Sequence, residues 1–428
     1  MAAPPIQSLV LSFEDARRVV EDHASRLSSR TTETAPLLHA AGRVLAESIT
    51  ADRDIPPFPR STRDGYAVRA ADLAKLPASL KVIGEIKAGP QHLPSTLNPG
   101  QAFAIMTGAP VPQGADAVVM VEYTSSQKAD SVEIKKSVEP GENIVAQGAE
   151  AKHGNLLLDR GTRLNQAAIA LAASVGRSRL QVFVRPQIAV LTTGDEIVEV
   201  DAEIGPTQIR NSNGYSLSVQ IQQAGGEPVL LPIAPDEPRR LRQLIEEGLQ
   251  SDLLIMTGGV SMGRYDLVEQ VLSELQAEFL FTGAKIQPGR PVVFGRIGSC
   301  GAGAPARSGA QDPAQHKYFF GLPGNPVSTM VTFELFARPV LEALAGASPS
   351  QLTFLHARLK SEIRVKPGLT RFLPAILSGQ CEDSQVELVP WQGSGDIAAQ
   401  ARSNCYIVVP PDREHIAAGD WTAVTFLT

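Results

Sequence analysis

The stretch that decides the fold is DLLIMTGGVSMGRYD, residues 252–266. It joins a short apolar run to a glycine-rich turn, and a helical pattern of apolar residues follows from about Asp266 to Leu275. The same order recurs upstream in IAVLTTGDE (188–196) and downstream in YFFGLPGNPVS (318–328). A buried strand that passes through a tight turn into a helix is typical of α/β folds.

Between these stretches the chain keeps alternating between strand and helix patterns. Residues 212–224 and 238–249 are predicted to be helices, and residues 228–233 and 291–297 are predicted to be strands. Alternation over this length predicts a parallel sheet with helices on both faces.

The segments on either side of this region have other patterns. Ser12 can cap a helix over residues 12–28, and a second helix is expected over 37–45. Short β-prone runs separated by Pro and Gly turns predict a small β-rich insert between Leu80 and Val138. Similar runs after Leu352 predict a small β-barrel or sandwich.

Composition limits the class of protein. A chain of 428 residues exceeds what one core supports, so at least two domains are expected. The net charge of -6 argues against a general nucleic-acid binder. Cys300, Cys381 and Cys405 form no metal-binding pattern and are expected to be reduced thiols. The N-terminus does not resemble a secretory signal and no apolar run reaches membrane-spanning length, so we expect a cytoplasmic protein.

Three glycine-rich loops are candidates for ligand binding, because ligands bind beyond the carboxyl ends of the strands in open parallel sheets. They are residues 192–196, 257–263 and 321–328. Glycines let a ligand approach the backbone, and the N–H groups of a helix start bind anions. Asn325 as cap and Pro326 in the first turn would make the third loop such a helix start. Together the loops favour a phosphate-bearing ligand, and neither a Walker loop nor GxGxxG is present.

Carboxylates accompany the same loops: Glu196, Asp236, Asp252 and Asp266. Phosphates with several carboxylates indicate Mg²⁺, which takes a few carboxylates together with substrate oxygens. Asp252 could instead cap a turn, and Asp266 could cap its helix. Lys285 and Arg290 flank the turn Gln287-Pro288-Gly289 and are the nearest candidates for holding an oxyanion.

Several motifs together resemble the molybdopterin molybdenumtransferase family, which includes the gephyrin E domain. They are PPFPRSTRDGYAV, IMTGAPVPQGADAVV, GENIVAQGAE, TTGDE, TGGVSMGRYD, QPGRP, GLPGNPVS and GSGD with ARSNCYIVVP. The motifs occur in the family's order and span almost the whole chain.

The resemblance implies an α/β multidomain fold. It consists of an elongated connecting domain (1–48 and 147–185), a β-rich inserted domain (49–146), a three-layer αβα domain with a parallel sheet (186–348) and a C-terminal β-barrel (349–428). The family forms head-to-tail homodimers, with the active site between the αβα domain of one subunit and the insert of the other.

The implied reaction inserts molybdenum from molybdate into adenylylated molybdopterin, with Mg²⁺ as cofactor and release of AMP. Molybdopterin adenylyltransferase and apo-molybdoenzymes are implied as transient partners, and neither nucleic acid nor a membrane is expected as a partner. Two alternatives are adenylylation of molybdopterin, against which the extra N-terminal and barrel domains argue, and a non-catalytic carrier or scaffold, against which the retained acids argue.

Functional residues carry over from the family's motifs. The implied catalytic residues are Asp64, supplied by the partner subunit, and Thr107, Glu196 and Asp266. The implied metal ligands are Asp266, Glu196 and Asp236. The implied substrate-binding residues are Gly258, Gly259, Ser261, Gly263, Asp236, Gln287, Arg290, Pro323, Gly324, Asn325, Ser328, Arg371 and Ser394.

The chain departs from the family pattern in three motifs. Arg63 stands where methionine is usual before Asp64, and Gln287 and Arg290 replace the lysines of the family's KPGKP turn. Arg371 lies in a motif that aligns with the family in more than one way. These changes leave room for a paralogue with an altered metal preference.

Overall fold

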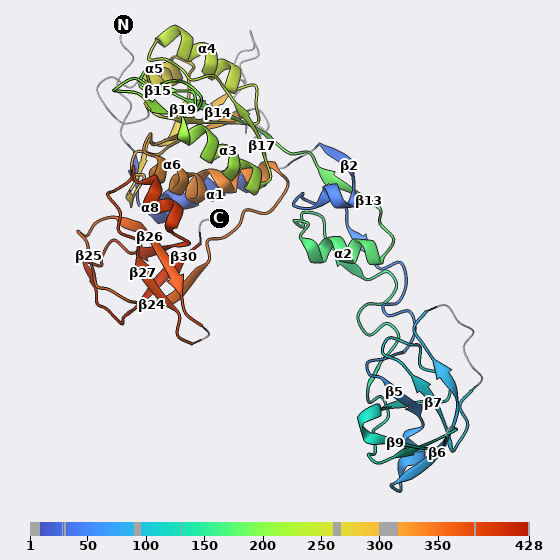
Figure 1. The fold of residues 1–428 in the computed structure, drawn as a ribbon. Helices are drawn as coiled ribbons and strands as arrows, with labels where there is room; N and C mark the ends of the chain where they lie inside the picture. Colours follow the sequence, from blue (N-terminus) through green and yellow to red (C-terminus); the bar gives the residue numbers. More distant parts are fainter. Residues whose placement is uncertain are drawn as a thin grey trace.

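The molecule is elongated in the computed structural model (Figure 1). The model describes residues 9–27, 29, 31–89, 96–128, 130–259, 267–298, 316–380 and 382–426. A body that contains the central sheet and the C-terminal barrel lies at one end, and an arm connects it to a separate β-rich lobe (Figure 1).

The central sheet of the body has six strands and is mixed. In order across the sheet they are β17 (Glu227–Leu230), β14 (Gln187–Thr192), β18 (Leu253–Thr257), β23 (His316–Leu322), β22 (Val293–Gly298) and β19 (Glu278–Phe281). The first four are parallel, but β22 runs antiparallel to β23 and to β19. The prediction of a fully parallel sheet was therefore wrong on this side. A parallel connection between β22 and β23 would need a crossover element, and no helical pattern lies between them in the sequence.

Helices pack on both faces of this sheet because successive strand residues point in opposite directions. Ile188 and Val190 face a core built with α3 (Ser212–Ala224), α6 (Pro326–Thr332) and α7 (Arg338–Leu344). Ala189 and Leu191 face α4 (Pro238–Gly248) and α5 (Leu267–Glu274). Helix α1 (Phe13–Ala24) lies in the segment that the family resemblance assigns to the connecting domain, yet its buried face joins the first of these cores.

A π-helical turn, η5 (Phe333–Ala337), joins α6 to α7. The prediction of one helix from the Asn325 loop to about Ala345 holds with this irregularity. Ser12 caps α1 as predicted, because its hydroxyl accepts from the Asp15 amide at 3.0 Å. The helix predicted over 37–45 is instead a short 3₁₀ turn, η1 (Leu37–Ala40), and Gly42 just beyond it has a left-handed φ of 76° that ends helical geometry.

The arm is built where the outgoing and returning chains pair. Its antiparallel ribbons are β2 (Thr32–Pro36) with β13 (Arg179–Phe183), β3 (Ile49–Thr50) with β12 (Leu156–Leu158), and β4 (Arg60–Ser61) with β11 (Ile144–Val145). Helix α2 (Gln166–Ser174) covers the first ribbon and is capped by Asn165, as predicted. Successive ribbons of this kind extend the chain away from the body (Figure 1).

The lobe at the far end of the arm is the predicted β-rich insert. Its sheet has the order β8 (Ala117–Met120), β5 (Gly65–Val68), β7 (Gln101–Ile105), β6 (Ala78–Ile86), β10 (Ser131–Ile134) and β9 (Thr124–Lys128), with 3₁₀ turns η2 (Ala70–Leu73) and η3 (Val121–Tyr123). Apolar side chains pack on both faces of the sheet and give the lobe cores of its own.

The C-terminal region forms the predicted barrel. Its strands β26 (Thr370–Ser378), β27 (Gln385–Leu388), β24 (Phe354–Leu359), β30 (Trp421–Thr425) and β28 (Cys405–Val409) follow one another around the sheet, and β28 pairs again with β26. Strand β21 (Ile286–Gln287) of the body extends this sheet, and helix α8 (Ile397–Arg402) precedes β28. The remaining short pairs are β1 (Val10–Leu11) with β20 (Gly283–Ala284), β15 (Ile197–Val198) with β16 (Ile209–Arg210), and β25 (Ile363–Arg364) with β29 (His415–Ile416).

Two predictions from composition can be compared with the described residues. None of the helices within the described ranges is both long and apolar enough to cross a membrane. Cys405 is a free, buried thiol, and burial raises its pKa to about 11, which makes it unreactive. Cys300 and Cys381 lie outside the described residues.

Candidate active site

The three glycine-rich loops follow β14, β18 and β23, which are neighbours in the sheet, so their first residues meet at one edge. The Thr193 amide donates to the Thr257 carbonyl at 2.9 Å, and the Thr257 hydroxyl donates to the Pro323 carbonyl at 3.0 Å. The amide nitrogen of Asn213 donates both to the Thr257 hydroxyl, at 3.0 Å, and to the Gly324 carbonyl, at 2.7 Å. Hydrogen bonds therefore hold the loops together before any ligand binds.

Two asparagines that were not predicted from the sequence organise this edge. Asn211 caps α3 by accepting from the Gly214 amide and also receives the Thr192 hydroxyl. Asn213 is 8% exposed and links the second and third loops. An asparagine directly before a predicted helix is a recognisable cap signal. The contacts of Asn213 with distant loops leave no such local signal.

Gly258 lies where two of the loops touch. Its φ is 113°, and a β-carbon there would overlap the Thr193 carbonyl oxygen. Gly258→Ala is therefore expected to destabilise the protein by at least about 2 kcal/mol, through left-handed strain and displacement of the first loop. Gly298→Ala, which meets no atom within 4 Å and has ordinary φ, is the matched control. Denaturant unfolding of both variants measures the difference, and equal midpoints would contradict the predicted close contact.

Acidic side chains gather beside the first loop. The Asp236 amide donates to Asp195 Oδ1 at 3.0 Å, and the side chain of Glu196 folds back over the α-carbon of Gly194. Burial, followed by repulsion from Asp195 and Glu196, raises the pKa of Asp236. The structure thus brings two predicted metal ligands, Glu196 and Asp236, into one electrostatic cluster, together with Asp195, which the sequence analysis did not select.

The remaining predicted residues of the second loop, Ser261, Gly263 and Asp266, lie outside the described residues. Within the described part of the chain, no group of three or more His, Cys, Asp or Glu side chains is arranged to hold a metal ion. Asp252 has the structural role considered for it, because its carboxylate accepts from the Gln187 amide at 2.8 Å.

The raised pKa of Asp236 lowers the stability of the folded protein at neutral pH. A carboxyl group whose pKa is raised on folding destabilises the folded state at neutral pH, and this penalty disappears as the pH falls through the raised pKa. Asp236→Asn should therefore stabilise the protein near pH 7 by less than about 1 kcal/mol, since solvent screens this exposed site. Unfolding midpoints measured from pH 7 down to acid should show the gain shrinking, and a gain that is constant with pH would refute this account.

A cleft of about 250 Å³ opens next to the third loop, between the body and the barrel. Six of the predicted substrate-binding residues line it: Gln287, Arg290, Pro323, Asn325, Ser328 and Ser394. The barrel also contributes Leu369 and Trp391, which the sequence analysis did not select. The turn before Arg290 can lie this close to α6 because Gly289 has no side chain, since a β-carbon there would overlap Thr332.

Asn325 does not act as the predicted cap. It occupies the N-cap position of α6, but its side-chain amide donates to the Ser394 hydroxyl at 2.9 Å and makes no capping hydrogen bond. The Ser394 carbonyl accepts from the Val327 amide at 3.0 Å, so the barrel fills part of the helix start that the sequence offered to an anion. Pro326 occupies the first turn as predicted.

Arg371 is brought beside the cleft by backbone pairing. It lies opposite Gln287 in the ladder between β21 and β26, and it is 8% exposed. Its guanidinium donates to the Leu369 carbonyl at 3.3 Å, and burial lowers its pKa. Arg371 itself is not among the residues that line the cleft, although its neighbour Leu369 is.

Asp64 and Thr107 form a separate pair on the insert. The Thr107 amide and hydroxyl both donate to Asp64 Oδ1, at 2.6 and 2.8 Å, and these two bonds lower the pKa of Asp64. Both residues are exposed, as is the neighbouring Arg63. Within one chain the arm separates this pair from the loops of the body (Figure 1).

Known protein families match this chain along most of its length. Residues 11–176 match the MoeA N-terminal region (domain I and II), residues 189–343 match a "Probable molybdopterin binding domain", and residues 356–427 match the MoeA C-terminal region (domain IV). A molybdopterin molybdenumtransferase of Nostoc sp. is 34% identical over 418 residues, which is 95% of this chain and 92% of the relative. One of Bacillus subtilis is 33% identical over 388 residues, covering 89% and 86%.

This chain belongs to the molybdopterin molybdenumtransferase family. Solved structures of the same family share its fold. Two molybdopterin biosynthesis MoeA proteins of Pyrococcus horikoshii superpose with TM-scores of 0.75 and 0.69, at 28% and 32% identity. They cover 97% and 98% of this chain and 100% and 99% of their own lengths. The resemblance inferred from the motifs is confirmed, and the chain is an enzyme of this family.

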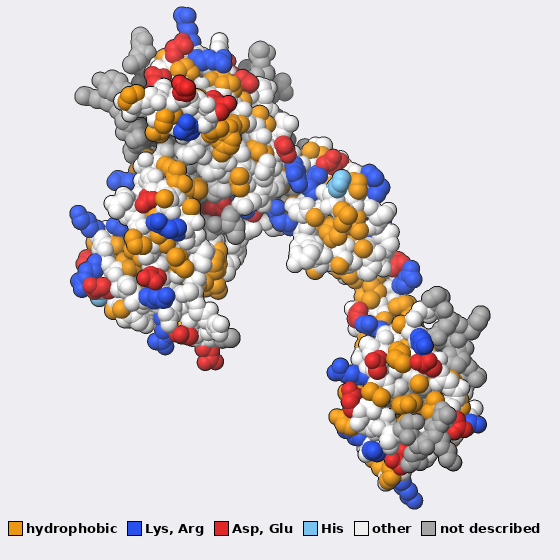
Figure 2. Space-filling view, in the orientation of Figure 1, with side chains coloured by type: hydrophobic (Ala, Val, Ile, Leu, Met, Phe, Trp, Pro, Cys, Tyr) orange, Lys and Arg blue, Asp and Glu red, His pale blue; other side chains and the backbone are white. Residues whose placement is uncertain are grey.

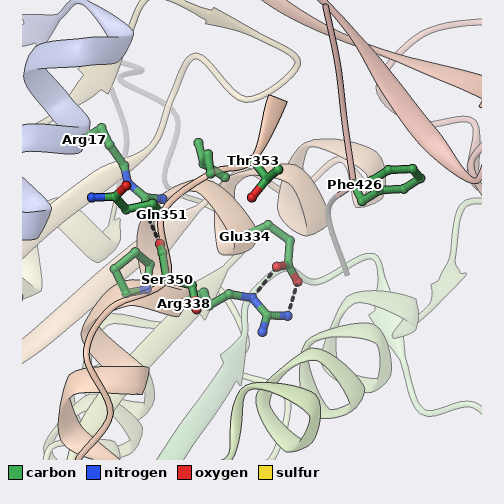
Figure 3. A pocket seen from close by; sticks show the side chains of 9 residues that line it. Arg17, Glu334, Arg338, Ser350, Gln351, Thr353 and Phe426 are labelled. Atoms are coloured by element: carbon green, nitrogen blue, oxygen red, sulfur yellow. Dashed lines mark hydrogen bonds and ion pairs between the residues drawn. The ribbon is translucent and has the colours of Figure 1, made fainter. Parts of the chain in front are cut away.

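A second cleft, of about 240 Å³, is lined by residues of α1, η5 and α7 and of the segment that leads into the barrel (Figure 3). Unlike the cleft at the third loop, it is lined by charges that already have partners. Arg338 forms a bidentate ion pair with Glu334, and Arg17 donates to the Ser350 carbonyl at 2.9 Å. Arg17 also donates to the Leu335 carbonyl in the π-turn at 2.6 Å. It shares no lining residue with the cleft at the third loop, so it is not a continuation of the candidate site.

Proposed function

We propose that this chain inserts molybdenum from molybdate into adenylylated molybdopterin and releases AMP, giving the molybdenum cofactor. The observation that carries the proposal is the cleft at the third loop, in which six residues from separate motifs meet on the fold of the molybdenumtransferase family. The relatives named above are molybdopterin molybdenumtransferases.

The cleft suits an oxyanion of the size of molybdate. Arg290 lines the cleft and supplies a positive charge, and Arg371 pairs through its backbone with Gln287, another lining residue. The Ser328 and Ser394 hydroxyls can donate to oxyanion oxygens. Arginine presents a planar set of donors that matches oxyanions, so Arg290 can serve in place of a lysine of the KPGKP motif.

The edge formed by the three loops suits the phosphates of an adenylylated substrate. Glu196 and Asp236 are close enough to repel, and a cation between them would relieve that repulsion. They fit Mg²⁺, which takes one or two carboxylates and completes its shell with water and phosphate oxygens. Magnesium would supply charge neutralisation on the phosphoanhydride that breaks when AMP leaves. Glu196 is exposed beside the loop and can order the attacking water.

We also propose that a second copy of the chain completes the site with Asp64 and Thr107. A single chain holds this pair at the end of the arm, away from Glu196 (Figure 1). Exposed apolar side chains flank both parts, Met106 and Val121 on the insert, and Tyr215 and Val219 on α3. Figure 2 shows apolar side chains among polar ones on the visible faces of the body, the arm and the lobe.

The test is release of AMP from molybdopterin adenylate by the purified protein with Mg²⁺, at physiological molybdate and then with tungstate. Cofactor formation is measured by reconstitution of an apo-molybdoenzyme. Molybdate-dependent AMP release with active cofactor would support the proposal and show that Gln287 and Arg290 suffice at the oxyanion cleft. Tungstate-dependent release alone would indicate a paralogue with another metal preference.

Two results would replace the proposal. Tight binding of the adenylate without turnover with either oxyanion would indicate a carrier or scaffold. Consumption of ATP with unadenylylated molybdopterin would indicate the adenylylating step. The insert, arm and barrel argue against that second alternative, since they surround the central domain in the relatives that match along most of this chain.

A further inference from the structure

Besides Leu369, the barrel contributes to the candidate site one short loop, residues 391–396, which we call the latch. Its Ser394 accepts two hydrogen bonds from the third loop of the body. The Val327 amide donates to its carbonyl at 3.0 Å, and the Asn325 side chain donates to its hydroxyl at 2.9 Å. The latch is thus one wall of the oxyanion cleft.

Asp396 closes the latch on itself. Its Oδ2 accepts from the Gln392 amide at 3.0 Å, at the beginning of the loop, and its Oδ1 accepts from the Ala399 amide at 2.9 Å, in the first turn of α8. These backbone donors lower the pKa of Asp396, so the side chain is an ionised acceptor. One carboxylate therefore fixes both ends of the loop that carries Ser394.

Trp391 fixes the latch between the body and the barrel. Its ring packs against the core of the body and also against the core of the barrel, and it lines the cleft. Helix α8, which Asp396 caps, contacts α6, whose start carries Asn325 and Ser328. The cleft wall consequently depends on how firmly Asp396 holds this loop.

We propose that Asp396 is a positioning residue for the oxyanion cleft, which holds the latch closed so that Ser394 keeps Asn325 and the start of α6 in place. The inference rests on the proposed function for its substrate, molybdate, but the closed latch itself is a property of the free protein. Asp396 does not line the cleft, so it acts through Ser394. Its loss should weaken molybdate binding more than it slows the chemical step.

The experiment uses the full chain with Trp421→Phe, which leaves Trp391 as the single tryptophan. Acrylamide quenching of Trp391 reports closure of the latch without any activity. In this background Asp396→Ala removes both hydrogen bonds, whereas Asp396→Ser can still cap α8 but is too short to reach Gln392 as well. Asn165→Ala is the matched control, because it removes an equivalent cap from α2 on the arm.

We expect both Asp396 variants to increase quenching of Trp391 at least about twofold and to raise the KM for molybdate about tenfold, with kcat changed less than about twofold. Asn165→Ala should change neither measurement. An Asp396→Ser protein that matches the parent would show that only the helix cap matters and would overturn the inference, as would unchanged quenching in Asp396→Ala. Absence of molybdenum transfer in the parent would refute the proposed function, while the quenching still decides whether Asp396 closes the latch.

Discussion

Alanine at Asp64 is expected to lower molybdenum transfer by at least about 100-fold, the range typical for a carboxylate that acts in proton transfer. Asp64 is exposed, and Thr107 donates two hydrogen bonds to one of its oxygens, which keeps it ionised and oriented. Few other contacts depend on it, so the fold should survive. Initial rates of cofactor formation measure the loss.

Asp72→Ala is the matched control for this prediction. Asp72 is another aspartate of the insert, partly exposed, and its carboxylate likewise accepts from a backbone amide, that of Gly100 at 2.9 Å, but no motif gives it a functional role. Its replacement should leave the rate within about twofold of the parent. Equal losses in both variants would indicate that Asp64 is a structural residue of the insert.

Mixing two inactive variants tests whether Asp64 acts in the partner's site. Asp64→Ala and Glu196→Ala chains should each be inactive as homodimers. In a random mixture half of the dimers combine the two chains, and each has one intact site, so about a quarter of the parent activity should return. No recovery, with mixed dimers verified by mass, would mean that the two acids do not meet between subunits.

Glu334→Ala is expected to destabilise the protein by about 3 kcal/mol, the cost of leaving one member of a buried ion pair without its partner. Glu334 is 4% exposed, and it receives Arg338 and the side-chain amide of Gln220. Burial raises the pKa of Glu334. Arg338 and Gln220 donate to its carboxylate and hold it at the π-turn that joins α6 to α7 (Figure 3). Without Glu334, Arg338 loses its bidentate partner, and the carboxylate of Glu342 lies farther from its guanidinium, at 3.8 Å.

Denaturant unfolding measures this effect, with Glu246→Ala as the matched control. Glu246 forms the same i,i+4 pair with Arg242, but on the exposed face of α4, where such a pair contributes less than about 0.5 kcal/mol. A Glu334→Ala protein as stable as the Glu246→Ala protein would show that the joint between body and barrel tolerates the lost charge.

The local elements could be predicted from the sequence because their signals are local. Helix α3 occupies the predicted residues 212–224, and Pro238 begins α4 as expected. The apolar runs and glycine turns identified three strands and the loops that follow them. The family motifs then named residues that the structure brings together in one cleft, among them Gln287, Asn325 and Ser394. Side-chain periodicity, caps and glycine turns depend on neighbours a few residues away, so composition and spacing were sufficient.

Tertiary structure decided what depends on distant partners. Strand β22 is antiparallel because it pairs with β23, and an apolar run has the same appearance in either direction. The side chain of Asn325 makes no capping hydrogen bond because it donates instead to the hydroxyl of Ser394, 69 residues away. Asp64 precedes β5 in the insert and Glu196 follows β14 in the body, and these elements lie at opposite ends of the molecule (Figure 1), although the family resemblance predicts that the two acids act in one site. The sequence by itself determined which elements form and which side chains can bind an anion or a metal ion or transfer a proton. Long-range hydrogen bonding and packing decided which of these side chains meet.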